Sequence, residues 1–193
     1  MRMHLWVLLT AFLSACGGGG DGGSPVPSSA FSYCGFNTGV GRIQGTVTSV
    51  HDGDTITVND QSVRLDSIDA PELTQAWGIQ SRDQLSALVL NQHVTVRYAK
   101  KDLYDRVVGT VFKSDCTNIS LKQVSSGAAW YYEAYRCDIE IRLRTAYASA
   151  QVSARAASQG LWGAPDVVAP WIFRNGVDAK THASYPNGDA ASD

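Results

Sequence analysis

The first half of the chain alternates short β-rich runs with polar turns. The runs contain Val47, residues 55–58 and residues 63–65, and turn residues separate them at positions 52–54 and 59–60. Runs of this length that are rich in β-branched residues and bounded by Asp, Asn and Gly are typical of strands joined by tight turns. The pattern therefore predicts three consecutive antiparallel strands.

A helical period follows these runs. Within residues 78–90, three apolar side chains recur at helical spacing, namely Leu85, Leu88 and Val89. This spacing predicts an amphipathic helix. Residues 94–98 then alternate apolar with polar side chains, and residues 107–112 form another apolar run, so two further strands are expected.

The last third of the folded region is predicted to be helical. A short helix around residues 121–124 should end at Gly127, and a longer one should end at Gly160, because glycine is a common helix stop. One face of the longer helix carries Leu143, Ala146, Tyr147, Ala150, Ala154 and Ala157. The order of strands, helix, strands and helices favours an α+β domain, a five-stranded OB-fold β-barrel with about three helices.

The first 16 residues have the pattern of an export signal. Arg2 precedes an apolar run over residues 5–13, which is shorter than the roughly 20 residues that a membrane-spanning helix needs. Residues 13–16 resemble a bacterial lipobox, so Cys16 is predicted to be lipidated and to hold the exported protein on a membrane, in the periplasm or on the cell surface. Ordinary secretion is the alternative.

Composition divides the remaining chain into three parts. Residues 17–42 begin with a Gly-, Ser- and Pro-rich stretch and are interpreted as a flexible tether. Residues 43–163 contain the predicted barrel and helices, and residues 164–193 are predicted to be a packed strap followed by a disordered tail. With 193 residues, 44% of them hydrophobic, the chain suits one globular domain, which we expect to be monomeric.

The net charge of −2 excludes a uniformly basic surface that would coat nucleic acid. A few local arginines could still bind phosphate, because a bound metal ion would supply positive charge at the site. Function must therefore be sought in a local constellation of side chains.

The cysteines are consistent with an oxidising compartment. If Cys16 is lipidated, two of the remaining three can pair, and Cys116 with Cys137 is the favoured bridge. If Cys16 is not lipidated, Cys16 and Cys34 could pair instead, and the number of cysteines is then even. No pair has the spacing of a zinc site.

Three polar blocks could carry chemistry. The first is the acidic turn at residues 52–55, which alone is more typical of a solvated hairpin. The second, residues 64–72, combines an arginine, two aspartates, a proline and a glutamate at one strand end. The third, residues 102–109, places Arg106 where a polar turn enters a strand, and by itself this arginine would be interpreted as a surface residue.

The three blocks together resemble the staphylococcal nuclease (thermonuclease) family. The resemblance consists of Asp52-Gly53-Asp54-Thr55, then Arg64-Leu65 through Ile68-Asp69-Ala70-Pro71-Glu72, then Asp105-Arg106 with Gly109. It extends over roughly residues 44–162, including the aromatic segment at 127–135 and the closing Gly160-Leu161-Trp162. Three separated blocks in the family's order are far more specific than any one of them.

The resemblance implies a role for each matching residue. Asp54 and Asp69, with the carbonyl of Ala70, would bind Ca²⁺, a cation that prefers hard oxygen ligands. The catalytic residues would be Arg64, Glu72 and Arg106: Glu72 would activate the attacking water, and the two arginines would hold the phosphate. Tyr132 and Tyr135 lie where the family places tyrosines near the substrate groove; packing between barrel and helix is the other interpretation.

One position departs from the family pattern. Asp66 stands where an apolar residue is usual, and it is expected either to pair with Arg64 or to point into solvent. The segment at 73–78 is also shorter than the mobile loop of the type member.

The resemblance therefore predicts a calcium-dependent endonuclease that cuts DNA and RNA and leaves 3'-phosphate ends. The alternative is a non-catalytic OB-fold module that binds nucleic acid or another partner, since the same fold serves many functions.

Overall fold

The structure is a computed structural model that describes residues 41–139 and 141–176, without the side chains of residues 136–138. The predicted export signal, Cys16, Cys34, most of the tether and the tail after Gly176 lie outside the described residues. No helix within the described ranges is long and apolar enough to span a membrane.

Five strands close into a barrel in the order β1-β2-β3-β6-β5. These are β1 (Gly41–Val50), β2 (Thr55–Val58), β3 (Gln61–Leu65), β5 (His93–Lys101) and β6 (Val107–Lys113). The first three pair antiparallel, as their sequence pattern predicts, and β5 pairs antiparallel with both β1 and β6. The predicted five-stranded barrel is confirmed.

The barrel closes through one parallel pairing. Leu65 of β3 lies opposite Gly109 of β6, so the end of β3 lies beside the beginning of β6. Successive side chains along each strand point to opposite faces, which brings a set of mostly β-branched residues into the barrel interior. The fully buried members of this set are Val47, Ile56, Val58, Val63, Leu65, Val94, Val96, Val107 and Val111.

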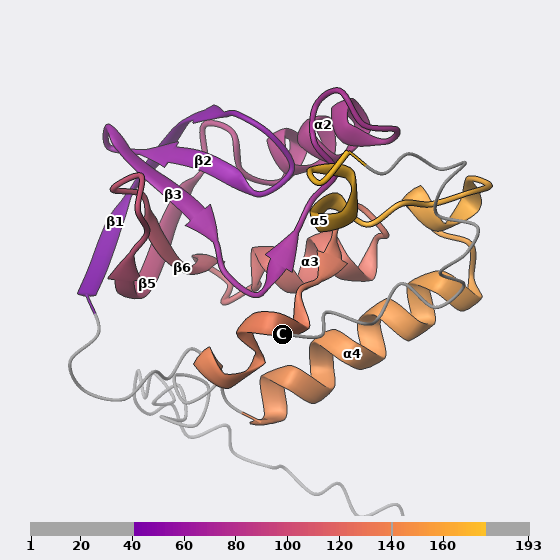
Figure 1. The fold of residues 1–193 in the computed structure, drawn as a ribbon. Helices are drawn as coiled ribbons and strands as arrows, with labels where there is room; N and C mark the ends of the chain where they lie inside the picture. The colour runs from indigo at the N-terminus through magenta and orange to yellow at the C-terminus, as the bar shows by residue number, and fades with distance from the viewer. Residues whose placement is uncertain (1–40, 140, 177–193) are drawn as a thin grey trace, which may run out of the picture. The chain divides into compact units, whose positions relative to one another are not determined.

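The predicted helices are present. They are α2 (Gly78–Val89), α3 (Ile119–Ser125) and α4 (Ile141–Ala156), and the structure adds the short α5 (Pro170–Phe173) and the 3₁₀ turns η1 (Glu133–Asp138) and η2 (Gly160–Gly163). In Figure 1, α3 lies between β6 of the barrel and the long α4. Asn118 caps α3 by accepting a hydrogen bond from the Leu121 amide at 3.0 Å.

A two-stranded ladder links the barrel to the C-terminal part of the fold. It pairs β4 (Ile68–Asp69) with β7 (Trp130–Tyr131), and the Tyr132 amide donates to the Ser67 carbonyl at 2.9 Å. This ladder was not predicted, because strands of two residues are too short to show a period of two. It fixes the position of Asp69 relative to the aromatic segment that follows Ala129.

The segment after Gly163 packs against β7, η2 and the loop before α2 through a second apolar cluster. Its buried members are Trp130, Leu161 and Ala169, with Trp77, Trp162, Val167, Trp171 and Ile172 against them. The cluster joins residues that are far apart in the chain, and it holds α5 against the loop that leads into α2.

Candidate functional site

The acidic turn between β1 and β2 is held against α2. The Asp54 amide donates to Oδ1 of Asp52 at 3.0 Å, which closes the turn locally. A Cβ atom on Gly53 would collide with the Ser81 hydroxyl of α2, and Gln123 donates to the Gly53 carbonyl at 2.9 Å. Glycine is therefore required here for close approach, and this packing fixes where the Asp54 carboxylate lies.

Asp54, Asp69 and Arg64 come together although their positions in the chain span 16 residues. Arg64 Nε lies 3.1 Å from Oδ1 of Asp54, and its Nη2 lies 3.1 Å from Oδ1 of Asp69. The Ala70 amide donates to Oδ2 of Asp54 at 2.7 Å. Arg64 thus bridges the two predicted metal ligands, and Ala70 lies beside them.

Burial shapes the charge of this centre. The pKa of Asp54 is raised to about 7, mainly because burial disfavours the charged carboxylate. The nearby Arg64 guanidinium opposes this shift, and the carboxylates of Asp52 and Asp69 contribute to it. Two buried carboxylates that repel each other are stabilised by an added cation.

The donor atoms fit a hard divalent cation. The described residues contain no group of three or more His, Cys, Asp or Glu side chains placed to hold a metal ion, so the protein would supply only the two carboxylates and the Ala70 carbonyl. Among the described residues that line this cleft there is neither a cysteine nor a histidine. An all-oxygen set of this kind suits Ca²⁺, which completes its coordination with water or substrate oxygens.

Glu72 follows Pro71 at the edge of the same centre. Its side chain is 38% exposed, and its Oε1 accepts from Nη1 of Arg174 at 2.8 Å. Arg174 also binds Asp69, with Nη2 at 2.6 Å from Oδ2 and Nη1 at 3.2 Å from Oδ1. The hydrogen bond to Asp69 raises the pKa of Arg174, and the bond to Glu72 adds to this effect.

Sequence reasoning did not identify Arg174. It follows the apolar segment at 170–173, beyond the region covered by the resemblance. The sequence offered one signal: residues 170–173 are apolar and aromatic, so they are expected to pack on the domain. Arg174, which follows them, would then lie near the domain surface. Which carboxylates Arg174 meets depends on the fold.

Arg106 enters the cleft from the turn between β5 and β6. Its Nε donates to Oδ2 of Asp102 at 2.7 Å, and its amide donates to Oδ1 of the same residue at 3.0 Å. Partial burial of Asp102 opposes ionisation, but the bonds from Arg106 and Tyr104 lower the pKa of Asp102. Arg106 also stacks on the Tyr104 ring, 5.4 Å from its centroid. Asp102 therefore orients Arg106.

One cleft of about 700 Å³ contains all of the predicted catalytic and metal residues. Arg64, Glu72 and Arg106 line it together with Asp54 and Asp69, and so do Tyr132, Tyr135 and Arg174. The two tyrosine rings contact each other edge to face with centroids 5.0 Å apart. Burial raises the pKa of Tyr132, and the Asp69 carboxylate adds to the effect.

Asp66 has a structural partner in the neighbouring strand. Its Oδ2 accepts from the Thr110 hydroxyl at 2.6 Å, and its amide donates to the Gly109 carbonyl at 3.0 Å. The predicted alternatives were Arg64 or solvent, whereas these bonds tie the end of β3 to β6.

The predicted disulfide is not formed in this structure. Cys116 is a free and exposed cysteine, at a positive φ of 63° in the turn after β6. The side chain of Cys137 lies outside the described part of the chain. The expected pairing overlooked that Cys116 occupies a tight turn on the surface.

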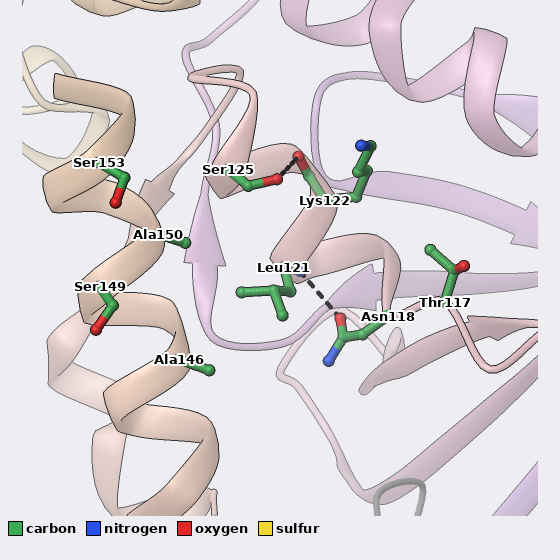
Figure 2. A pocket seen from close by; sticks show the side chains of 9 residues that line it. All are labelled: Thr117, Asn118, Leu121, Lys122, Ser125, Ala146, Ser149, Ala150 and Ser153. Atoms are coloured by element: carbon green, nitrogen blue, oxygen red, sulfur yellow. Dashed lines mark hydrogen bonds between the residues drawn. The ribbon is translucent and has the colours of Figure 1, made fainter. Parts of the chain in front are cut away.

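A second hollow, of about 500 Å³, lies between α3 and α4 (Figure 2). Ala146 and Ala150 of α4 point toward Leu121 of α3 across it, and Ser149, Ser153 and Lys122 also line it. Lys122 is the one charged residue among those that line it. The cleft with converging charges is therefore the candidate site.

Comparisons with known proteins agree with this geometry. The family model described as "Staphylococcal nuclease homologue" matches residues 62–164. An Escherichia coli protein named "Uncharacterized endonuclease" is 41% identical over 137 residues, which cover 69% of this chain and 86% of that protein. The "Micrococcal nuclease" of Shigella flexneri is 35% identical over 151 residues, with 72% of this chain and 84% of that protein covered. The chain belongs to the staphylococcal nuclease family.

Proposed function

We propose that this protein is a calcium-dependent endonuclease that hydrolyses phosphodiester bonds in DNA and RNA and leaves 3'-phosphate ends. One observation supports this most: Arg64 and Glu72 line the same cleft as the distant Arg106, beside the Asp54 and Asp69 carboxylates. Membership of a nuclease family makes hydrolysis the reaction class for this cleft.

Asp54, Asp69 and the Ala70 carbonyl are the residues that would hold Ca²⁺. The ion, when bound, polarises a phosphoryl oxygen and makes water more acidic. Arg64 fixes the two carboxylates at 3.1 Å each, so they are in place before the substrate arrives.

Glu72 is the general base of this proposal. Only its Oε1 is held, by Arg174, and within the described residues its Oε2 makes no hydrogen bond. That second oxygen can accept a proton from an attacking water at the exposed side of the cleft.

Arg106 is the residue best placed to bind phosphate. Asp102 holds its Nε, and neither terminal nitrogen makes a hydrogen bond to the part of the chain that the structure describes. Those nitrogens can meet two phosphate oxygens and stabilise charge that grows in the transition state. Tyr132 and Tyr135, at the wall of the cleft, offer aromatic faces to a nucleobase.

The proposed place of action is outside the cytoplasm. The support is the sequence pattern of residues 1–16, in which Cys16 would carry a lipid that holds the enzyme on a membrane. The sequence also allows secretion without the lipid. Labelling of cells with a radioactive fatty acid separates the two, because only a lipidated Cys16 takes up the label and Cys16→Ala abolishes it.

A cleavage assay tests the activity. Purified protein without residues 1–16 is incubated with DNA or RNA in Ca²⁺ or in excess chelator, beside Glu72→Gln and Arg106→Gln. We expect cleavage only with Ca²⁺, and a loss of about 100-fold or more in each variant. Arg82→Gln is the matched control, since Arg82 pairs with Asp83 on α2 away from the cleft.

The same assay contains the outcomes that count against the proposal. Binding of nucleic acid without cleavage by the wild-type protein would indicate a non-catalytic module. Full cleavage by both cleft variants would remove Glu72 and Arg106 from the mechanism. Products that a polymerase extends before phosphatase treatment would exclude 3'-phosphate ends.

A further inference from the structure

We propose that Arg174 is a positioning residue for the Glu72 carboxylate, and that the C-terminal segment at 164–176 is thereby a working part of the active site. The proposal rests on the proposed function, in which Glu72 is the general base. Arg174 lies ten residues beyond Ala164, where the match to the family model ends.

Asp69 holds the Arg174 guanidinium in a fixed position. The Asp69 side chain is only 2% exposed and belongs to the β4–β7 ladder. Arg174 contacts both of its oxygens, at 2.6 Å and 3.2 Å. Two parallel contacts to a carboxylate fix the plane of a guanidinium, as one contact cannot.

Nη1 of Arg174, which contacts Asp69, also contacts Glu72. Nη1 of Arg174 lies 2.8 Å from Oε1 of Glu72, so the guanidinium joins a buried carboxylate to a half-exposed one. Without this contact the Glu72 side chain would be free to populate several rotamers, since it is 38% exposed. The contact holds one oxygen of a side chain that lines the cleft and leaves the other for the proposed proton transfer.

A second link connects the main chain of Glu72 to the same segment. The Glu72 amide donates to Oε1 of Gln75 at 3.2 Å, and Nε2 of Gln75 donates to the Val168 carbonyl at 2.6 Å. Gln75 is buried, so this bridge is shielded from water. Side chain and main chain of Glu72 are therefore both tied to residues 168–174.

The segment itself is firmly packed. Ala169 is fully buried, and Trp171 contacts the rings of Trp130 and Tyr132, with centroids 5.5 Å and 5.2 Å away. Trp77, at the end of the Glu72 loop, joins the same cluster. A rigid support of this kind can hold a catalytic group to within a fraction of an ångström, which matters because small misplacements reduce rates strongly.

Steady-state kinetics of Arg174→Gln tests the proposal. We expect kcat to fall by about 10- to 100-fold, the usual effect of losing an orienting partner, with KM within about twofold of wild type. Arg174→Lys should recover part of kcat, because lysine keeps the charge but cannot bridge two carboxylates. Added guanidinium at low millimolar concentration should partly restore kcat of Arg174→Ala. Arg82→Gln again serves as the control for a surface arginine.

Other results would overturn it. A rise in KM at unchanged kcat would indicate that Arg174 binds phosphate. A rise in kcat would indicate that Arg174 inhibits the enzyme by holding Glu72. Unchanged kinetics would show that Arg174 has no role in the reaction. If wild-type protein cleaves nothing, the proposed function fails first. The positioning is then judged by hydrogen exchange at residues 71–77, which Arg174→Gln must accelerate and Arg82→Gln must not; equal exchange in both would reject it.

Discussion

Two arginines of the site differ in what surrounds them. Arg64 is 17% exposed and meets Asp54 and Asp69, which are 7% and 2% exposed. Arg106 is 30% exposed, and its partner Asp102 is 22% exposed. A buried charge that loses its partner costs far more than a solvated one, so the two residues should contribute unequally to stability.

Substituting each arginine by methionine separates the two cases. Arg64→Met should lower the free energy of unfolding by about 3 kcal/mol, because it leaves the buried Asp54 carboxylate without its cation. Arg106→Met should cost less than about 1 kcal/mol. Urea unfolding followed by circular dichroism measures both. Equal losses in the two variants would show that burial does not control the energy of these pairs.

At the scale of elements, the loop from Glu72 to Trp77 determines where the proposed base lies. The Gln75 amide donates to the Glu72 carbonyl at 2.8 Å, and the Gly78 amide donates to the Gln75 carbonyl at 3.0 Å. A Cβ atom on Gly78 would collide with the Glu72 carbonyl. The start of α2 therefore packs directly on the main chain of the loop that carries Glu72.

Gly78→Ala tests this packing. Helix propensity alone would favour alanine, yet the collision should lower stability by about 1–3 kcal/mol and reduce kcat, since the loop must shift to make room. Ala87→Gly on the exposed face of α2 is the control: it should cost about 1 kcal/mol without changing kcat. A Gly78→Ala protein with wild-type stability and rate would contradict the close approach.

At the scale of the whole molecule, two apolar clusters are present within residues 41–139 and 141–176. The barrel interior is built from side chains of successive strands and of α2, whereas the second cluster gathers Trp77, Trp130, Leu161 and Trp171 from four distant parts of the chain. The second cluster supports the C-terminal segment that carries Arg174. A mutation in the second cluster should therefore lower kcat as well as the free energy of unfolding.

Trp171→Ala tests whether the second cluster affects both stability and kcat. We expect a stability loss of about 2 kcal/mol, less than for a fully buried tryptophan, together with a lower kcat, because α5 loses its contacts with Trp130 and Tyr132. Far-UV circular dichroism during urea unfolding gives the stability, and nuclease kinetics give kcat. Val152→Ala, at an exposed position of α4, should change neither. A loss of stability at unchanged kcat would separate the second cluster from the site.

The sequence by itself determined the barrel and the three longer helices. Alternation of apolar residues, the turns at 52–54 and 59–60 and the stops at Gly127 and Gly160 are local features, and local features can be read along a chain. It also determined the cluster of Arg64, Asp69 and Glu72, because these residues occupy neighbouring positions.

Only the tertiary structure decided which distant groups complete the site. The β4–β7 ladder, the Thr110 partner of Asp66 and the contact of Arg174 with Asp69 and Glu72 all join residues more than 40 positions apart. The barrel, whose strands show a local pattern, is confirmed, whereas Cys116, which was predicted to form a bridge, is a free cysteine in the structure. No periodicity or motif records a pairing of distant residues, because the pairing results from the way distant elements pack together and not from the local pattern around either residue.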